Sequence, residues 1–191
     1  TQRLFDYGLE QLDRKDITKR EPPFPSPFEA VLHDYDRSHP DEEGGLTYQA
    51  WAYGYVKAMW PHLSLEASKV RTGSSRQNRY GDIDGYQGPD LMLSVEVKDR
   101  HIDGSNVESE LGSMMELAEN ATTIVVAICR SASDDAITEL READVNVLTD
   151  EQLAQRLQLW DYHKQNRAVQ GMAHYLTNIE EDHGALQRLL R

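Results

Sequence analysis

The sequence RYGDIDGYQGPDLMLSVEVKDRH, residues 79–101, decides the fold that we predict for the whole chain. Ile83 lies between two aspartates, and residues 87–90 (QGPD) have the composition of a tight turn. Residues 91–98 are rich in apolar, strand-forming side chains. Two strands joined by a turn make a β-hairpin, so we predict a hairpin over this stretch.

Side chains alternate between the two faces of a strand. Asp82 and Asp84 therefore share one face of the first hairpin strand, and Glu96 and Lys98 share one face of the second. Pairing of the two strands can bring these four side chains together and turn the apolar residues between them into the core, namely Ile83, Val95 and Val97. The sequence thus predicts a cluster of carboxylates beside one lysine.

Such a cluster has a chemical use. Carboxylate oxygens bind Mg²⁺, which keeps several waters and shares its shell with a substrate phosphate. The metal lowers the pKa of a bound water, and a neighbouring lysine orients or deprotonates that water or acts as a point charge on the phosphate. The pattern favours hydrolysis of a phosphodiester. The competing interpretation is a half-exposed strand with an ordinary cross-strand ion pair.

The strings Gly-Asp-Ile-Asp-Gly (81–85) and Val-Glu-Val-Lys (95–98) resemble the PD-(D/E)xK nuclease superfamily, and residues 69–101 are most similar to the SacI-type restriction endonuclease group. The resemblance implies an α/β fold with a restriction-endonuclease-like core, in which helices flank a mixed β-sheet in the order αβββαβ. It also implies Mg²⁺-dependent cleavage of double-stranded DNA, with Mn²⁺ as a substitute, by a homodimer that serves in restriction or phage defence. The alternative is a catalytically inactive module of this fold that binds nucleic acid or a protein partner.

The resemblance also assigns roles to single residues. Asp84 and Glu96 are the expected metal ligands, and the carbonyl of Val97 is expected to complete the shell. Lys98 would position or activate the attacking water, and Asp82 would be a second or alternative ligand. The wording Gly-x-Ile-Asp favours Asp84 over Asp82, and both remain candidates.

Pro89-Asp90 spells the name of the superfamily but does not fit its geometry. Asp90 precedes Glu96 by six residues, which leaves no room for a turn between two paired strands. We therefore place Asp90 in the turn of the hairpin.

The net charge of −13 argues against a general DNA-binding surface. Positive charge is nevertheless concentrated in residues 69–80, which hold no acid and lead directly into the first hairpin strand. An arginine just after the second strand is also suited to bidentate phosphate contact. The expected phosphate-binding residues are Lys69, Arg71, Arg76, Arg79 and Arg100. The competing interpretation of residues 69–80 is an ordinary polar loop.

Length and composition limit the class of protein. The chain has 191 residues, of which 39% are hydrophobic, and this suits one globular domain with a helical appendage. No apolar run approaches the ~20 residues of a membrane span, and no signal peptide is visible. Cys129 is the single cysteine and lies in an apolar run, so we expect a buried thiol and a cytoplasmic protein. Because the chain does not begin with Met, we expect a processed chain or a piece of a longer protein with further domains.

The rest of the chain predicts three segments. Residues 1–44 are an N-terminal arm, residues 45–149 are the nuclease core, and residues 150–191 are a C-terminal helical extension. Gly171 and Gly184 weaken the prediction of long helices in the extension. We expect helices over residues 46–60, 105–120, 134–143, 150–160, 165–176 and 179–190, and further strands over residues 63–70, 122–129 and 145–148.

Overall fold

The structure of the chain is a computed structural model that describes residues 27–34, 45–70, 79–120 and 122–189. Of the predicted N-terminal arm it describes only helix α2, Pro27–Asp34. Two of the predicted phosphate-binding residues, Arg71 and Arg76, lie outside the described residues.

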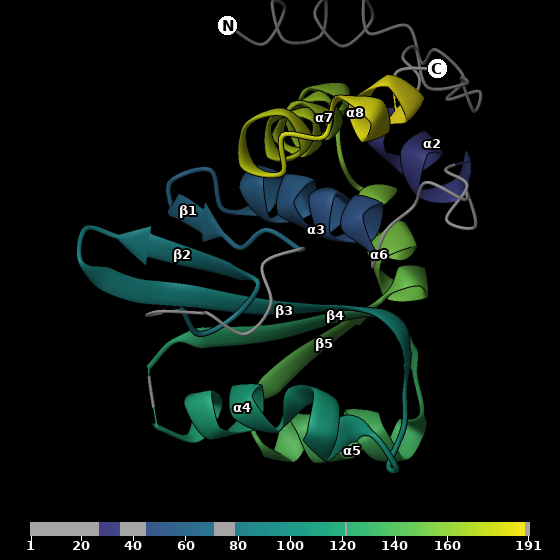
Figure 1. Ribbon diagram of the computed structural model, residues 1–191. Coiled ribbons are helices and arrows are strands. Elements are labelled where there is room, and N and C mark those ends of the chain that lie inside the picture. The colour runs from purple at the N-terminus through teal and green to yellow at the C-terminus, as the bar shows by residue number, and fades with distance from the viewer. Residues whose placement is uncertain (1–26, 35–44, 71–78, 121, 190–191) are drawn as a thin grey trace, which may run out of the picture.

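A five-stranded mixed sheet forms the centre of the molecule, with the strands in the order β1-β2-β3-β4-β5 (Figure 1). The first three strands pair antiparallel, and β3, β4 and β5 pair parallel. The α/β class and the mixed sheet that the sequence predicts are confirmed. The strands are β1 (Ser64–Ala67), β2 (Ile83–Gln87), β3 (Asp90–Ile102), β4 (Ile124–Ala132) and β5 (Val145–Thr149).

Helices cover both faces of the sheet (Figure 1). One face carries α4 (Val107–Asn120) and α5 (Asp134–Glu142). The other carries α3 (Leu46–Met59), α6 (Asp150–Leu157) and α7 (Tyr162–His174). The chain continues through the π-helix η1 (Tyr175–Ile179) to α8 (His183–Leu189). None of the described helices combines the length and the apolarity needed to cross a membrane.

The side chains that start the helices explain several of these bounds. Ser133 accepts a hydrogen bond from the backbone N–H of Ala136 and begins α5. Thr149 and Gln152 form a capping box, in which each side chain bonds the other's backbone N–H, and this begins α6 directly after β5. Such caps satisfy amide groups that have no partner within the helix.

Each face of the sheet has its own core. On the α3 face the aromatic side chains of α3 stack on Phe28 of α2 and on Trp160 between α6 and α7, with ring centroids 4.5 Å apart for Phe28 and Trp51 and 5.2 Å apart for Tyr55 and Trp160. These aromatic side chains of α3 are therefore packed inside. On the other face, Leu111 and Met114 of α4 pack against β4. Leu153 and Met172, from the segment predicted as an extension, belong to the same core as α3.

Strand β3 is central because it is hydrogen-bonded on both sides. Val95 lies opposite Ile83 of β2 and Val126 of β4, and all three side chains face α3. Glu96 lies opposite Ala127 of β4, which belongs to the core on the α4 side. Alternation along β3 therefore turns Glu96 and Lys98 toward the α4 face of the sheet.

Helices α3 and α7 approach each other closely at two glycines. A Cβ atom on Gly54 would lie 2.4 Å from the carbonyl oxygen of Ala168, and one on Gly171 would lie 3.1 Å from the Cα of Gly54. Gly171 thus lies inside the continuous helix α7 and does not interrupt it. A glycine is needed there because the backbones of α7 and α3 touch.

We predict that Gly54→Ala lowers the free energy of unfolding by about 2 kcal/mol, because the added methyl group must push the two helices apart. Urea denaturation monitored by circular dichroism measures the change. Gly104→Ala is the matched control, since a Cβ at that position meets no atom within 4 Å. Equal effects of the two substitutions would show that the close contact does not determine how α3 and α7 pack.

Candidate active site

Asp84 is held by the turn that leads into β2. Its carboxylate accepts hydrogen bonds from the backbone N–H of Tyr80 (3.0 Å), the backbone N–H of Gly81 (3.1 Å) and the hydroxyl of Ser94 (2.7 Å). The side chain is 0% exposed. Asp84 and Ser94 are also direct partners in the β2–β3 register. Both oxygens of this carboxylate are therefore used within the fold.

Asp82 lies where β2 begins and connects three strands. Its carboxylate accepts a hydrogen bond of 2.9 Å from the backbone N–H of Val97 on β3. Its own backbone carbonyl accepts one from the N–H of Ser68, just after β1. Because Ile83 pairs with Val95, the register continues to Asp82 opposite Glu96. Asp82 is 7% exposed and Glu96 is 4% exposed.

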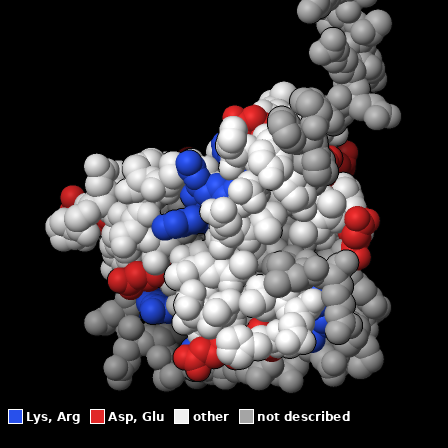
Figure 2. All heavy atoms as spheres, turned by 90° about the horizontal axis from the view of Figure 1, so that it is seen from above, with Lys and Arg blue, Asp and Glu red and all other residues white. Residues whose placement is uncertain are grey.

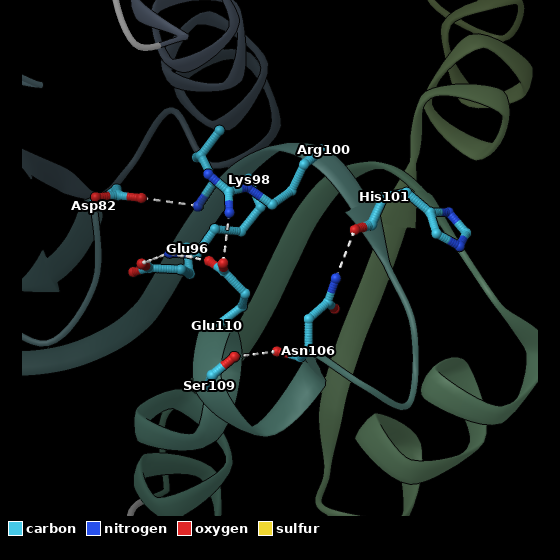
Figure 3. Close-up of polar contacts among 9 residues, drawn as sticks. Asp82, Glu96, Lys98, Arg100, His101, Asn106, Ser109 and Glu110 are labelled. Atoms are coloured by element: carbon cyan, nitrogen blue, oxygen red, sulfur yellow. Dashed lines mark hydrogen bonds and ion pairs between the residues drawn. The ribbon is translucent and has the colours of Figure 1, made fainter.

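Lys98 lies between two carboxylates from different elements (Figure 3). Its Nζ is 3.0 Å from Oε1 of Glu96, two residues earlier on β3, and 3.4 Å from Oε2 of Glu110 on α4. Nη1 of Arg100 lies 2.6 Å from the other carboxylate oxygen of Glu110, Oε1. Asp82, Glu96, Lys98, Arg100 and Glu110 are called the carboxylate cluster below.

The surroundings of Lys98 fix its charge. Burial acts to lower the pKa of the ammonium group, but the carboxylates of Glu96, Asp82 and Glu110 outweigh burial, and the pKa lies above the ordinary lysine value. Lys98 is therefore a cation at neutral pH. In this arrangement it can orient a water or stabilise negative charge on a phosphate, but it cannot accept a proton.

Glu110 was not among the residues singled out from the sequence. The helix around it, predicted over residues 105–120, buries the apolar side chains of Val107, Leu111 and Met114 on one face. Glu110 is three residues after Val107 and four before Met114, so it lies on that same face. The position of an acid among these buried apolar residues is the sequence signal that could have shown that Glu110 points toward the sheet.

The three predicted phosphate-binding residues that the structure describes, Lys69, Arg79 and Arg100, have other partners. Lys69 lies 3.6 Å from Glu181, and Arg79 donates a hydrogen bond of 3.2 Å to the hydroxyl of Ser68. Arg100, although 60% exposed, is bound to Glu110. Figure 2 views the molecule from the side of α7 and α8, and the described part of this face shows one small group of Lys and Arg with scattered acidic groups. The described residues on this face form no broad basic surface.

The donor set suits a hard metal ion. Among the described residues no group of three or more His, Cys, Asp and Glu side chains is arranged to hold a metal. Mg²⁺ needs fewer protein ligands, because it keeps several waters and often binds only one or two carboxylates. Asp82 and Glu96, buried on adjoining strands next to the backbone of Val97, offer such oxygens and no softer ligand. These residues fit the ion that the sequence predicts.

No protein-family model matches the chain, and no curated protein matches it. A function can therefore be inferred only from the chain's own residues, above all from the carboxylate cluster.

We predict that Asp84→Asn lowers the free energy of unfolding by about 2 kcal/mol, because an amide NH₂ would face at least one of the three donors that Asp84 now satisfies. Asp82→Asn should cost less, since its amide oxygen can still accept from Val97. Urea titration of the two variants beside wild type measures this difference. A larger loss for Asp82→Asn would contradict the structural role given to Asp84.

Glu110→Gln should lower the pKa of Lys98, because it removes one of the three carboxylates that raise it. NMR titration of the lysine Cε and Nζ resonances measures this pKa. Glu108→Gln is the matched control, since Glu108 is exposed on the same helix and does not act on Lys98. An unchanged pKa in Glu110→Gln, or an equal shift in both variants, would contradict the contact between Glu110 and Lys98.

Proposed function

We propose that the chain is a Mg²⁺-dependent endodeoxyribonuclease that hydrolyses phosphodiester bonds of double-stranded DNA in restriction or phage defence. Asp82 and Glu96 are the metal ligands, and the carbonyl of Val97 is expected to complete the shell. Lys98 positions the attacking water and the scissile phosphate. Asp84 supports the site by holding the turn that leads into β2.

The burial of the acids carries this proposal. A cross-strand ion pair on an ordinary half-exposed strand leaves its charges in water, where they cost little. Asp82 and Glu96 are instead 7% and 4% exposed, and both act on one lysine. Taking several like charges out of water is expensive unless they are paired or bind a metal ion. A cation-binding catalytic site explains why the chain keeps this arrangement.

Asp82 is a better candidate than Asp84 for the first ligand. The strand register places Asp82 opposite Glu96, whereas Asp84 lies opposite Ser94, one step further from Lys98. The pKa of Lys98 responds to Asp82 and Glu96. Asp84 already accepts three hydrogen bonds, so using it as a ligand would cost the fold some of them.

The chemistry divides between the ion and the chain. Mg²⁺, when bound, supplies a water of lowered pKa and neutralises charge on the phosphate. Glu96 and Asp82 fix their oxygens on two hydrogen-bonded strands, so little reorganisation is needed. Lys98 stays protonated and directs its charge at the oxygen on which negative charge develops. Glu110 and Arg100 hold the lysine from the side of α4.

Two parts of this proposal are expectations from the sequence. Cleavage of both strands of a duplex needs two sites, so the family resemblance implies a homodimer. The positive charge of residues 69–80 predicts contacts to the DNA backbone from Lys69, Arg71, Arg76 and Arg79. Arg100 contributes to phosphate binding only if it leaves Glu110, because its present ion pair occupies the guanidinium.

Plasmid cleavage in Mg²⁺ tests the proposal directly. Wild type should convert supercoiled DNA to open-circular or linear forms, and EDTA should stop the reaction. Glu96→Gln and Lys98→Ala should each lose at least about 100-fold in rate, since each removes a group that acts in the transition state. Circular dichroism should show that both variants remain folded.

Asp90→Asn is the matched control for the cleavage assay. Asp90 is exposed at the first position of β3, so its loss should leave the rate unchanged. Cleavage that persists in Glu96→Gln and Lys98→Ala would overturn the assignment of the site. If wild type neither cleaves DNA nor binds Mg²⁺ or Mn²⁺, the proposed catalytic function is wrong. The alternative is then a catalytically inactive module that binds nucleic acid or a protein partner.

A further inference from the structure

A pocket of about 440 Å³ lies beside β5, at the end of the sheet away from β1 and β2. It is separate from the carboxylate cluster, which is built on β3 and α4. Its walls come from the last turn of α5 and from α6, and residues 146–148 of β5 form its floor. The proposed catalysis does not use this pocket.

The pocket runs along an open strand edge. β5 is the last strand of the sheet and is hydrogen-bonded to β4 on one side only. Three consecutive strand residues line the pocket although their side chains alternate between faces, so the pocket follows the edge of the strand. Leu140 of α5 and Leu153 of α6 belong to cores on opposite faces of the sheet. The two walls therefore rise on either side of the strand edge.

The charge of the lining is opposite to that of the chain. The whole protein has a net charge of −13, yet the pocket is lined by Arg141 and Arg156 and by no carboxylate. Both arginines are exposed, and neither forms an ion pair with another described residue. In contrast, Arg100 and Arg130 are bound to Glu110 and Asp99.

We propose that this groove binds an extended acidic peptide segment, which adds to β5 as a sixth strand. The backbone groups on the open edge of β5 would supply main-chain hydrogen bonds, as in other cases of strand addition. Neighbouring side chains of the added strand point to opposite faces, so two consecutive acidic residues reach both walls. One carboxylate then binds Arg141 on the α5 wall, and the next binds Arg156 on the α6 wall.

A second copy of this chain fits the groove less well. Two-fold pairing of β5 with β5 would place the α5 wall of one copy beside the α5 wall of the other, so Arg141 would face Arg141. The same holds for Arg156. Like charges placed together in this way disfavour the pairing. The charge of the walls selects an acidic strand instead.

A labelled peptide of sequence Thr-Val-Glu-Glu-Val-Thr is the probe, and Thr-Val-Gln-Gln-Val-Thr is its neutral partner. Fluorescence anisotropy should show saturable binding of the acidic peptide and binding of the neutral one weaker by at least about fivefold. Arg141→Gln and Arg156→Gln should each lower the affinity for the acidic peptide about threefold or more. Arg167→Gln, an exposed position on α7, should leave binding unchanged. Amide hydrogen exchange should slow in β5 when the acidic peptide is present.

Several results would overturn the proposal. These are no saturable binding of the acidic peptide, equal binding of the two peptides, or full binding by both arginine variants. Displacement of the peptide by inorganic phosphate at equal concentration, without protection of β5 amides, would instead identify a site for small anions. A dimer in sedimentation experiments that forms through β5 and excludes the peptide would assign the edge to a second copy. The experiment is independent of nuclease activity.

Discussion

Strand β3 is hydrogen-bonded to neighbours on both sides, and this constraint fixes both the core and the carboxylate cluster. A shift of one residue would turn every side chain to the opposite face of the sheet. Val95 would then leave the aromatic core under α3, and Glu96 would enter it. The antiparallel partner β2 and the parallel partner β4 must agree on the same register. The register that buries the apolar core therefore also fixes the positions of the acids. No further contact is needed to place Glu96 on the correct face of the sheet.

The carboxylate cluster opposes stability. Buried acids cost free energy of hydration, and the fold compensates with specific contacts: one hydrogen bond from Val97 to Asp82, and a lysine shared by Glu96 and Glu110. Asp84, next to the cluster, accepts three hydrogen bonds of its own. Groups that stabilise a fold poorly in this way are often kept for function. The contacts also keep the side chains in place before any ligand arrives, which is a requirement for catalysis by positioned charges.

Local patterns in the sequence were sufficient for the sheet and for the two strand-borne acids near Lys98, Asp82 and Glu96. Alternation of Asp82, Ile83 and Asp84 predicted their faces correctly, and the apolar run of β4 predicted a buried strand, because both depend on residues next to each other in the chain. Contacts between residues that are distant in the sequence were harder to predict. Glu110 reaches Lys98 only because α4 returns across the sheet. Gly171 weakened the prediction of its helix from the sequence, whereas in the structure it lies where the backbone of α7 contacts Gly54 of α3. Strand length was also underestimated, since β3 runs to Ile102 by pairing with β4.

The glycine contact between α3 and α7 joins segments that are synthesised far apart in time. α3 is complete about a hundred residues before α7 emerges from the ribosome. Until then the backbone of α3 around Gly54 has no partner, and the aromatic side chains of α3 lack part of their cover. Contacts of such long range form late in folding. The nascent chain therefore carries an exposed apolar helix until α7 has been synthesised, and it depends on α7, or on a chaperone, to conceal that surface.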